Sequence, residues 1–318
     1  MKLGVCAQVF YHLPFREALA AAARLGFEAI ELPVDARSPF VDLDAALAGG
    51  WRELRAAVRD AGLTISALSN HQEGQLLLGP HGSDTDAIHA GDADEKVRYA
   101  TQRLGQTAAL AEALEVPVVC GFTGCEDYSR WFPWPDPLGY EKMAPVFVER
   151  VRPVLDEFAR RGVRFAHECH PRQFAYNLET AQWALALLDH HPAFGFNLDP
   201  ANLLLAGMDP VVFVAELGDR VLHVHAKDGE RVAHHIARSG LLAHGRWDRR
   251  DRGFRFRVPG WGDVAWKPLL TELRLAGYDG TLAVEHEDPT MGRIEGLTKA
   301  VEYLNPLLLR DPPEARWW

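Results

Sequence analysis

Cysteine is scarce in this chain, and its spacing excludes a disulfide-based or redox architecture. The 318 residues contain only Cys6, Cys120, Cys125 and Cys169, with no CxxC pair and no disulfide framework. Three of them, Cys6, Cys120 and Cys169, fall in or beside apolar strand-like runs, where cysteine acts as a small buried side chain. A chain of this length can bury a full core without such cross-links. We therefore expect buried cysteines with no redox role.

Long apolar runs and an excess of positive charge are also missing. No segment offers 18 unbroken apolar residues, and the opening MKLGVCAQVF lacks a signal-peptide pattern. We therefore expect a cytoplasmic protein without a membrane partner. The 34 Lys and Arg residues are outnumbered by 44 Asp and Glu residues, which leaves a formal net charge of −10. A nucleic-acid partner is disfavoured, because phosphate binding needs concentrated positive charge.

Glycine motifs that bind nucleotides are absent too. No GxGxxG follows the first strand-like run, and no GxxxxGK[ST] occurs anywhere, which weakens the case for an open doubly wound sheet. What the sequence does contain is an alternation of short apolar runs with longer amphipathic helical patterns. The predicted strands are residues 3–7, 29–32, 64–68, 117–121, 164–167, 194–198, 220–224 and 281–284. The predicted helices are residues 15–25, 44–61, 95–114, 141–161, 178–188, 209–217, 267–276 and 294–307.

This alternation predicts the fold class. Repeated βα units imply a parallel sheet, and eight of them favour closure into a barrel. We expect an α/β fold, a single (β/α)8 TIM barrel, in one domain that spans residues 1–318. Residues 69–93 and the stretch that follows the seventh strand, up to residue 263, are expected to be irregular.

Acidic residues and a histidine follow four successive predicted strands. They lie in RFAHECHP, GFNLDPANL, VLHVHAKD and LAVEHEDP, which contribute Glu168, Asp199, His225 and Glu285. Residues just past the strand ends face the catalytic mouth of such a barrel. A buried carboxylate needs a partner, and one cation would satisfy all four groups. A single acid or histidine at a strand end more often anchors a loop, but four at equivalent positions favour a metal site.

The donor types also indicate which metal to expect. Three carboxylates and one imidazole suit Mn²⁺ or Mg²⁺, with Zn²⁺ and Co²⁺ as alternatives. A site without a Cys ligand and with room for water is typical of catalysis rather than of structural stabilisation.

The order E-x-H-P, D-P-x-N, H-x-K-D and V-E-x-E-D-P resembles the xylose isomerase-like sugar isomerase/epimerase superfamily. The resemblance spans most of the chain and is strongest over residues 165–304, notably GYDGTLAVEHEDP followed by EGLTKAVEYL. It implies a barrel with one divalent metal, often Mn²⁺. The residues that match the ligands of the family are Glu168, Asp199, His225 and Glu285.

The resemblance also implies an activity. A metal-dependent isomerase or epimerase would act through an enediolate on a keto sugar or polyol, with Glu168 and Glu285 as the proton carriers. Loss of a β-leaving group from the same intermediate would instead make the chain a lyase, similar to inosose dehydratase or eliminating 3-keto glycosides. Many ketose epimerases of the family carry a His where this chain has Asn202. The EHEDP ending looks more like members that act on larger polyols or 3-keto glycosides.

Several other side chains are predicted to surround the substrate. The candidate substrate-binding residues are His71, His170, Asn202, Arg231 and Trp131. The alternatives are a loop-anchoring hydrogen bond for His170, a solvated loop for Arg231 and a small local aromatic core around Trp131. We expect Lys227 and Asp228 to form a salt bridge near the site, and His223 to pack towards the helices.

Two other classes of function are disfavoured. An abasic-site endonuclease needs a cluster of zinc ions, but the first two strands offer only Gln8 and Glu31 near their ends. A non-catalytic sugar-binding barrel would not need four metal ligands. The expected partner is a small sugar or polyol, and the surface tryptophans are compatible with a homo-oligomer.

Overall fold

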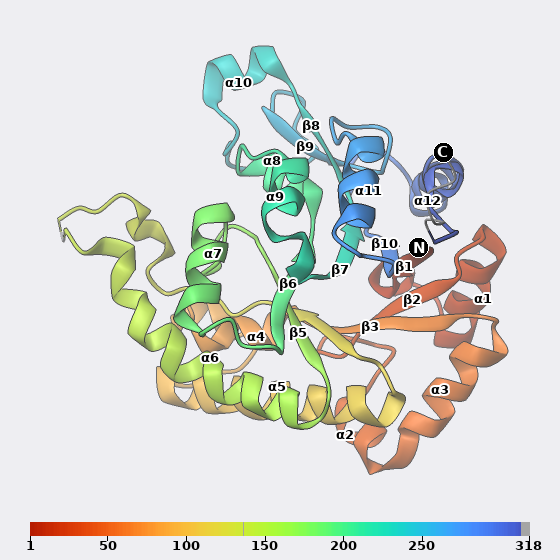
Figure 1. Cartoon of the computed structure of the whole chain (residues 1–318), viewed down its shortest axis with the longest axis horizontal. Coiled ribbons are helices and arrows are strands. Elements are labelled where there is room, and N and C mark those ends of the chain that lie inside the picture. The colour runs from red at the N-terminus through yellow and green to blue at the C-terminus, as the bar shows by residue number, and fades with distance from the viewer. Residues whose placement is uncertain (136, 313–318) are drawn as a thin grey trace, which may run out of the picture.

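The computed structural model describes residues 1–135 and 137–312, and eight parallel strands form a closed barrel in it (Figure 1). Around the barrel the strands follow the order β1, β10, β7, β6, β5, β4, β3, β2. Their bounds are β1 (Lys2–Cys6), β2 (Ala29–Pro33), β3 (Thr64–Asn70), β4 (Val118–Gly121), β5 (Arg164–Glu168), β6 (Phe194–Leu198), β7 (Val221–Ala226) and β10 (Thr281–Val284). The predicted (β/α)8 barrel is therefore confirmed.

Helices surround the barrel on its outer side (Figure 1). They are α1 (Phe15–Leu25), α2 (Leu43–Ala45), α3 (Trp51–Asp60), α4 (His71–Gly74), α5 (Ala93–Leu114), α6 (Met143–Arg160), α7 (Leu178–Leu187), α8 (Pro200–Leu205), α9 (Pro210–Leu217), α10 (Ala233–Ser239), α11 (Trp266–Leu275) and α12 (Arg293–Leu304). Shorter helical turns are η1 (Ala7–Phe10), η2 (Ala46–Gly50), η3 (Gln75–Leu77), η4 (Ser83–Thr85), η5 (Tyr128–Trp131), η6 (Gly139–Lys142), η7 (Gly218–Arg220) and η8 (Asn305–Leu307).

Closure of the barrel joins the first and last strands of the chain. β1 pairs with β10 in parallel, with Val5 opposite Val284, and β10 pairs with β7 on its other side. Every residue of β2, β4, β6 and β10 is buried, because side chains fill the interior while helices cover the outside. All four cysteines are buried and unpaired, as expected.

One predicted helix is broken. The pattern over residues 44–61 predicts one continuous helix, but Gly49 adopts a φ of 125° and separates α2 from α3. Glycine reaches this backbone conformation without the steric penalty that a Cβ would impose. The amphipathic spacing continues across the break, so the pattern alone did not reveal it.

The stretch after the seventh strand is more regular than predicted. The strands β8 (Asp228–Arg231) and β9 (Phe254–Arg257) form an antiparallel pair within it. The sequence FRFR alternates buried phenylalanines with half-buried arginines, which is the period of a strand with one face covered. Together with α10, this pair projects beyond the barrel at the top of Figure 1. The predicted irregular segment 69–93 likewise contains α4, η3 and η4.

The parallel order of the strands decides where the site forms. β5, β6, β7 and β10 are consecutive in the barrel, so their carboxyl ends meet at one arc of one rim. No helix within the described part of the chain is both long and apolar enough to span a membrane. Residues 313–318, the end of the predicted domain, lie outside the described residues.

Candidate metal centre

Four buried side chains converge where β5, β6, β7 and β10 end. Glu168 is the last residue of β5, Asp199 follows β6, His225 lies near the end of β7, and Glu285 follows β10. Each offers one ligand atom, and these atoms all lie within 4.8 Å of one another. The structure thus brings together the four residues that the sequence singles out.

Local structure orients Asp199. The side chain of this residue caps the N-terminus of α8, where its Oδ1 accepts hydrogen bonds from the amides of Ala201 and Asn202 at 2.9 and 3.2 Å. Pro200 occupies the first turn of the helix, where no donor is needed. The cap engages Oδ1, while Oδ2 lies 2.8 Å from both Asn202 Nδ2 and Lys227 Nζ.

His225 presents one ring nitrogen to the carboxylates and the other to the barrel interior. Its Nδ1 lies 3.1 Å from Glu168 Oε2 and 3.5 Å from Glu285 Oε2, yet it has no hydrogen-bond partner among the described residues. Its Nε2 lies 2.8 Å from Glu31 Oε2. A buried nitrogen that faces two carboxylates outside hydrogen-bond geometry is oriented as a metal ligand would be.

Side-chain amides hold the carboxylates in place. Asn202 Nδ2 donates to Glu168 Oε1 at 2.7 Å and to Asp199 Oδ2 at 2.8 Å. Asn197 Nδ2 donates to Glu168 Oε2 at 3.0 Å. Asn202 therefore links two ligands, while its own Oδ1 stays unpartnered among the described residues.

The sequence predicted no role at this site for two amide donors, Gln8 and Asn197. Gln8 Nε2 donates to Glu285 Oε1 at 2.8 Å, and Asn197 supports Glu168. The signal for Asn197 was its position two residues before Asp199, which places both on the inward face of the strand. Gln8 comes two residues after β1, at the same rim as the other site residues.

Lys227 lies among the ligands and does not pair with its neighbour in sequence. Its Nζ is 2.8 Å from Asp199 Oδ2, 2.6 Å from Glu285 Oε2 and 3.1 Å from Glu287 Oε2. The predicted salt bridge with Asp228 is wrong, because successive residues of an extended chain point to opposite sides. Asp228 instead accepts a hydrogen bond from Trp266 Nε1 at 3.0 Å and from backbone amides.

The concentration of negative charge is visible in the pKa values. Burial raises the pKa of Asp199 to about 7, even though Lys227 lies beside it. Burial would also raise the pKa of Glu285, but Lys227 and His225 outweigh it and lower the pKa to about 2. Burial disfavours a charged imidazole, yet the carboxylates around it, Glu31 foremost, hold the pKa of His225 well above its usual value. A cation bound here would favour the charged form of Asp199, the ligand carboxylate whose pKa burial raises.

These features fit a divalent cation. Metal–ligand bonds of about 2.0–2.6 Å leave ligand atoms about 3–5 Å apart around one ion, which matches the clustering of the four atoms. The unpartnered Nδ1 of His225 is aimed at the same point as the carboxylates. Glu168, Asp199, His225 and Glu285 would therefore hold the metal.

A cleft of about 310 Å³ opens beside the ligands. His71 and His170 line it together with Lys227 and Glu287. His71 Nε2 lies 3.2 Å from Glu168 Oε2, whereas His170 Nδ1 lies 2.7 Å from the carbonyl oxygen of Pro171. The aromatic rings of Tyr11 and Phe122 complete part of the wall.

Two of the predicted substrate-binding residues lie elsewhere. Arg231, on β8, has its Nε 3.4 Å from Asp263 Oδ2 and a side chain that is 43 % exposed. Trp131 is 62 % exposed and borders a separate hollow with Tyr140 and Trp183. Neither is among the described residues that line the cleft beside the ligands, and the buried Asn202 is not among them either.

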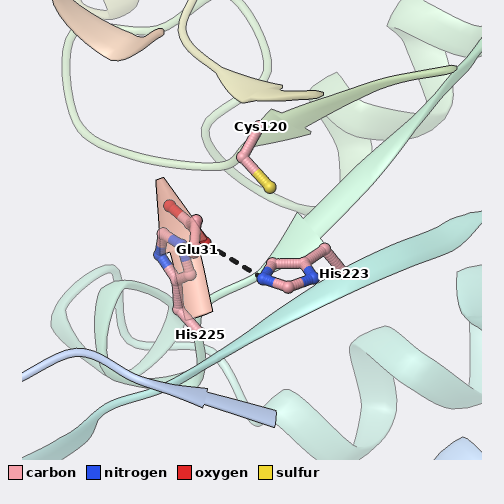
Figure 2. Close-up of side chains that lie close together, drawn as sticks. All are labelled: Glu31, Cys120, His223 and His225. Atoms are coloured by element: carbon pink, nitrogen blue, oxygen red, sulfur yellow. Dashed lines mark hydrogen bonds and ion pairs between the residues drawn. The ribbon is translucent and has the colours of Figure 1, made fainter. Parts of the chain in front are cut away.

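The predicted orientation of His223 is wrong. His223 is buried in the barrel interior, where its Nε2 lies 3.0 Å from Glu31 Oε2. Residues two apart on a strand share a face, so His223 and His225 both point inward. Together with Cys120 and Glu31, they form a second group whose ligand-type atoms lie within 4.8 Å of one another (Figure 2).

Comparison with known proteins identifies relatives. A sequence model described as "Xylose isomerase-like TIM barrel" matches residues 19–307. The uncharacterized protein YfiH of Bacillus subtilis (strain 168) is 28 % identical over 323 residues, which cover 96 % of this chain and 98 % of YfiH. An inosose dehydratase of Lacticaseibacillus casei is 33 % identical over 115 residues, but these cover only 34 % of this chain and 36 % of that protein.

A solved structure shares the fold. The apo form of 3-keto-D-glucoside 4-epimerase, YcjR, from E. coli superposes with a TM-score of 0.68. The match covers 96 % of this chain and 99 % of YcjR, at 15 % sequence identity. This likeness concerns the architecture.

A pair of neighbouring carboxylates provides a matched test of metal binding. Mn²⁺ at about 100 times its Kd should raise the free energy of unfolding of the wild type by about 2.7 kcal/mol through mass action, measured by chemical denaturation with and without metal. Glu285→Gln removes one of the four ligands and should abolish most of this gain. Glu287→Gln changes a carboxylate outside the four-residue group and should retain it. Equal responses of the two variants would contradict the assignment of Glu285.

Proposed function

Because the chain belongs to the xylose isomerase-like TIM barrel family, we propose that it is a divalent-metal-dependent isomerase or epimerase of a keto sugar or polyol. The observation that carries this proposal is the convergence of Glu168, Asp199, His225 and Glu285 at one rim, beside an open cleft. Mn²⁺ is the proposed metal because three of the four donors are carboxylates, and Mg²⁺, Co²⁺ and Zn²⁺ are alternatives to test.

The lining of the cleft suits a polyhydroxylated substrate. Polar groups of Gln8, His71 and His170 can exchange hydrogen bonds with hydroxyls, and the rings of Tyr11 and Phe122 can pack against C–H groups. Asn202 is buried and bonds to Glu168 and Asp199, so its proposed influence on the substrate is indirect, through these two carboxylates. The proposed substrate contacts are therefore His71 and His170, and Asn202, Arg231 and Trp131 are not proposed as contacts.

The arrangement of the two glutamates supports a proton-transfer mechanism. Glu168 and Glu285 come from β5 and β10, the two ends of the four-strand arc, and both line the cleft. One carboxylate can take a proton from the carbon next to a carbonyl, and the other can return it. When bound, the metal supplies positive charge that stabilises the developing enediolate. Return of the proton to the neighbouring carbon gives isomerisation. Return of the proton to the opposite face of the same carbon gives epimerisation.

A second candidate function is a lyase, and Lys227 is the observation that favours it. Its Nζ lies in the cleft, 2.6 Å from Glu285 Oε2. After a glutamate takes the proton from carbon, the C–O bond to a β-hydroxyl can break with its electron pair going to oxygen. A proton from the Lys227 ammonium then completes a molecule of water. The partial match to inosose dehydratase points to the same outcome.

Solvent deuterium exchange tests the glutamate mechanism without knowledge of the product. Wild-type protein with Mn²⁺ should place deuterium beside the carbonyl of one class among ketoses, inososes and 3-keto glycosides, measured by NMR in D₂O. Glu168→Gln and Glu285→Gln, each saturated with Mn²⁺, should slow this exchange by about 100- to 10,000-fold. Trp131→Ala, at an exposed site outside the cleft, serves as the control. If both glutamine variants bind the metal and still exchange deuterium at the wild-type rate, the glutamate mechanism is wrong.

Lys227→Gln separates the two reactions. If the chain is a lyase, the variant should still exchange deuterium but lose release of water by about 100-fold or more, because the leaving hydroxyl lacks its acid. Product analysis by mass spectrometry, which detects the loss of 18 mass units, checks this result. A wild type that forms only an isomer or epimer, with no dehydrated product, would exclude the lyase.

A further inference from the structure

Beneath the proposed metal centre, Glu31 lies between two histidines in the interior of the barrel (Figure 2). Its Oε2 lies 2.8 Å from His225 Nε2 and 3.0 Å from His223 Nε2, and the three side chains are at most 2 % exposed. Glu31 comes from β2, whereas both histidines come from β7, and β1 and β10 separate these strands in the barrel. The contact therefore crosses the interior.

We propose that Glu31 is a positioning residue that fixes the orientation and tautomer of His225, an inference that rests on the proposed metal site. An imidazole that binds a metal must be neutral, and a neutral imidazole carries one N–H group. When the Nε2–H of His225 donates to Glu31, the lone pair is left on Nδ1, the nitrogen that faces Glu168 and Glu285. The opposite tautomer would point an N–H at the metal position and leave a buried carboxylate facing a lone pair.

His223 holds Glu31 in turn. Its Nε2 approaches the same Oε2 atom as His225, so the carboxylate is pinned by two donors. A buried carboxylate is costly unless it is paired and hydrogen-bonded, and the two N–H groups meet that requirement. His223 thus prevents Glu31 from turning away from His225. The three residues form one rigid support beneath the metal ligand.

A second metal ion in this layer is the competing explanation. The Cys120 sulfur points towards Glu31 and His223, and the donor set of one Cys, one Glu and two His residues would suit zinc (Figure 2). However, His225 Nε2 and Glu31 Oε2 lie only 2.8 Å apart, which is closer than the spacing of about 3–5 Å expected for two ligands of one ion. The separations of 2.8 and 3.0 Å are those of hydrogen bonds to one shared oxygen. The geometry therefore favours the support over a second ion.

Metal affinity of two variants in the same layer tests the proposal. Glu31→Gln keeps the size of the side chain but replaces the charged acceptor, and it should raise the Kd for Mn²⁺ about 10- to 100-fold. Cys120→Ala removes an equally buried group that makes no hydrogen bond to His225 within the described chain, and it should leave the Kd unchanged within about twofold. Mn²⁺ binding to the full-length protein is measured by electron paramagnetic resonance. At saturating Mn²⁺, the kcat of Glu31→Gln should recover towards wild type.

A spectroscopic readout on the wild type makes the test independent of whether the variants fold. In the Zn²⁺-loaded protein with ¹⁵N-labelled histidine, two-bond ¹H–¹⁵N correlations should show His225 with hydrogen on Nε2 and metal on Nδ1. The reverse assignment would overturn the proposal.

The outcomes separate this inference from the proposed function. Wild type that binds no divalent metal would contradict both. Wild type that binds one ion, with equal affinity in Glu31→Gln, would contradict only the role of Glu31. If the wild-type chain binds two ions and the Cys120→Ala variant binds only one, a second metal site lies in this layer, and the proposed hydrogen-bonded support is wrong.

Discussion

Repulsion among three buried carboxylates is the constraint on which the arrangement of this rim depends. Glu168, Asp199 and Glu285 lie within a few ångströms of one another and away from bulk water. Lys227 contacts two of them, and His225 faces the third, yet the pKa of Asp199 stays raised to about 7 because of its burial. Positive charge from a divalent metal would stabilise the ionised form of this cluster further.

The barrel provides the geometry that this charge cluster needs. Four consecutive strands place one ligand each at the same rim, while the side-chain amides of Gln8, Asn197 and Asn202 donate hydrogen bonds to the carboxylates. Beneath the rim, the proposed role of Glu31 extends this support across the interior to β2. Loops and strand ends carry the functional side chains, and the packed interior restricts how the ligands can move.

The fold and the membership of the four-residue cluster could be predicted because both follow from local patterns repeated along the chain. Apolar runs marked the strands, and one acid or histidine at each strand end marked the rim. Contacts across the interior could not be predicted, since the pairing of Glu31 with His223 depends on the tilt and stagger of the closed barrel. The position of Lys227 among the ligands and the hairpin of β8 and β9 depend on tertiary packing in the same way.

Anomalous X-ray scattering from crystals grown with Mn²⁺ tests the central claim most directly, because it locates the ion without reference to any substrate. The account predicts one strong peak per chain, within bonding distance of Glu168, Asp199, His225 Nδ1 and Glu285. A peak among Glu31, Cys120 and His223, or the absence of a peak at the rim with Mn²⁺ in excess, would contradict it.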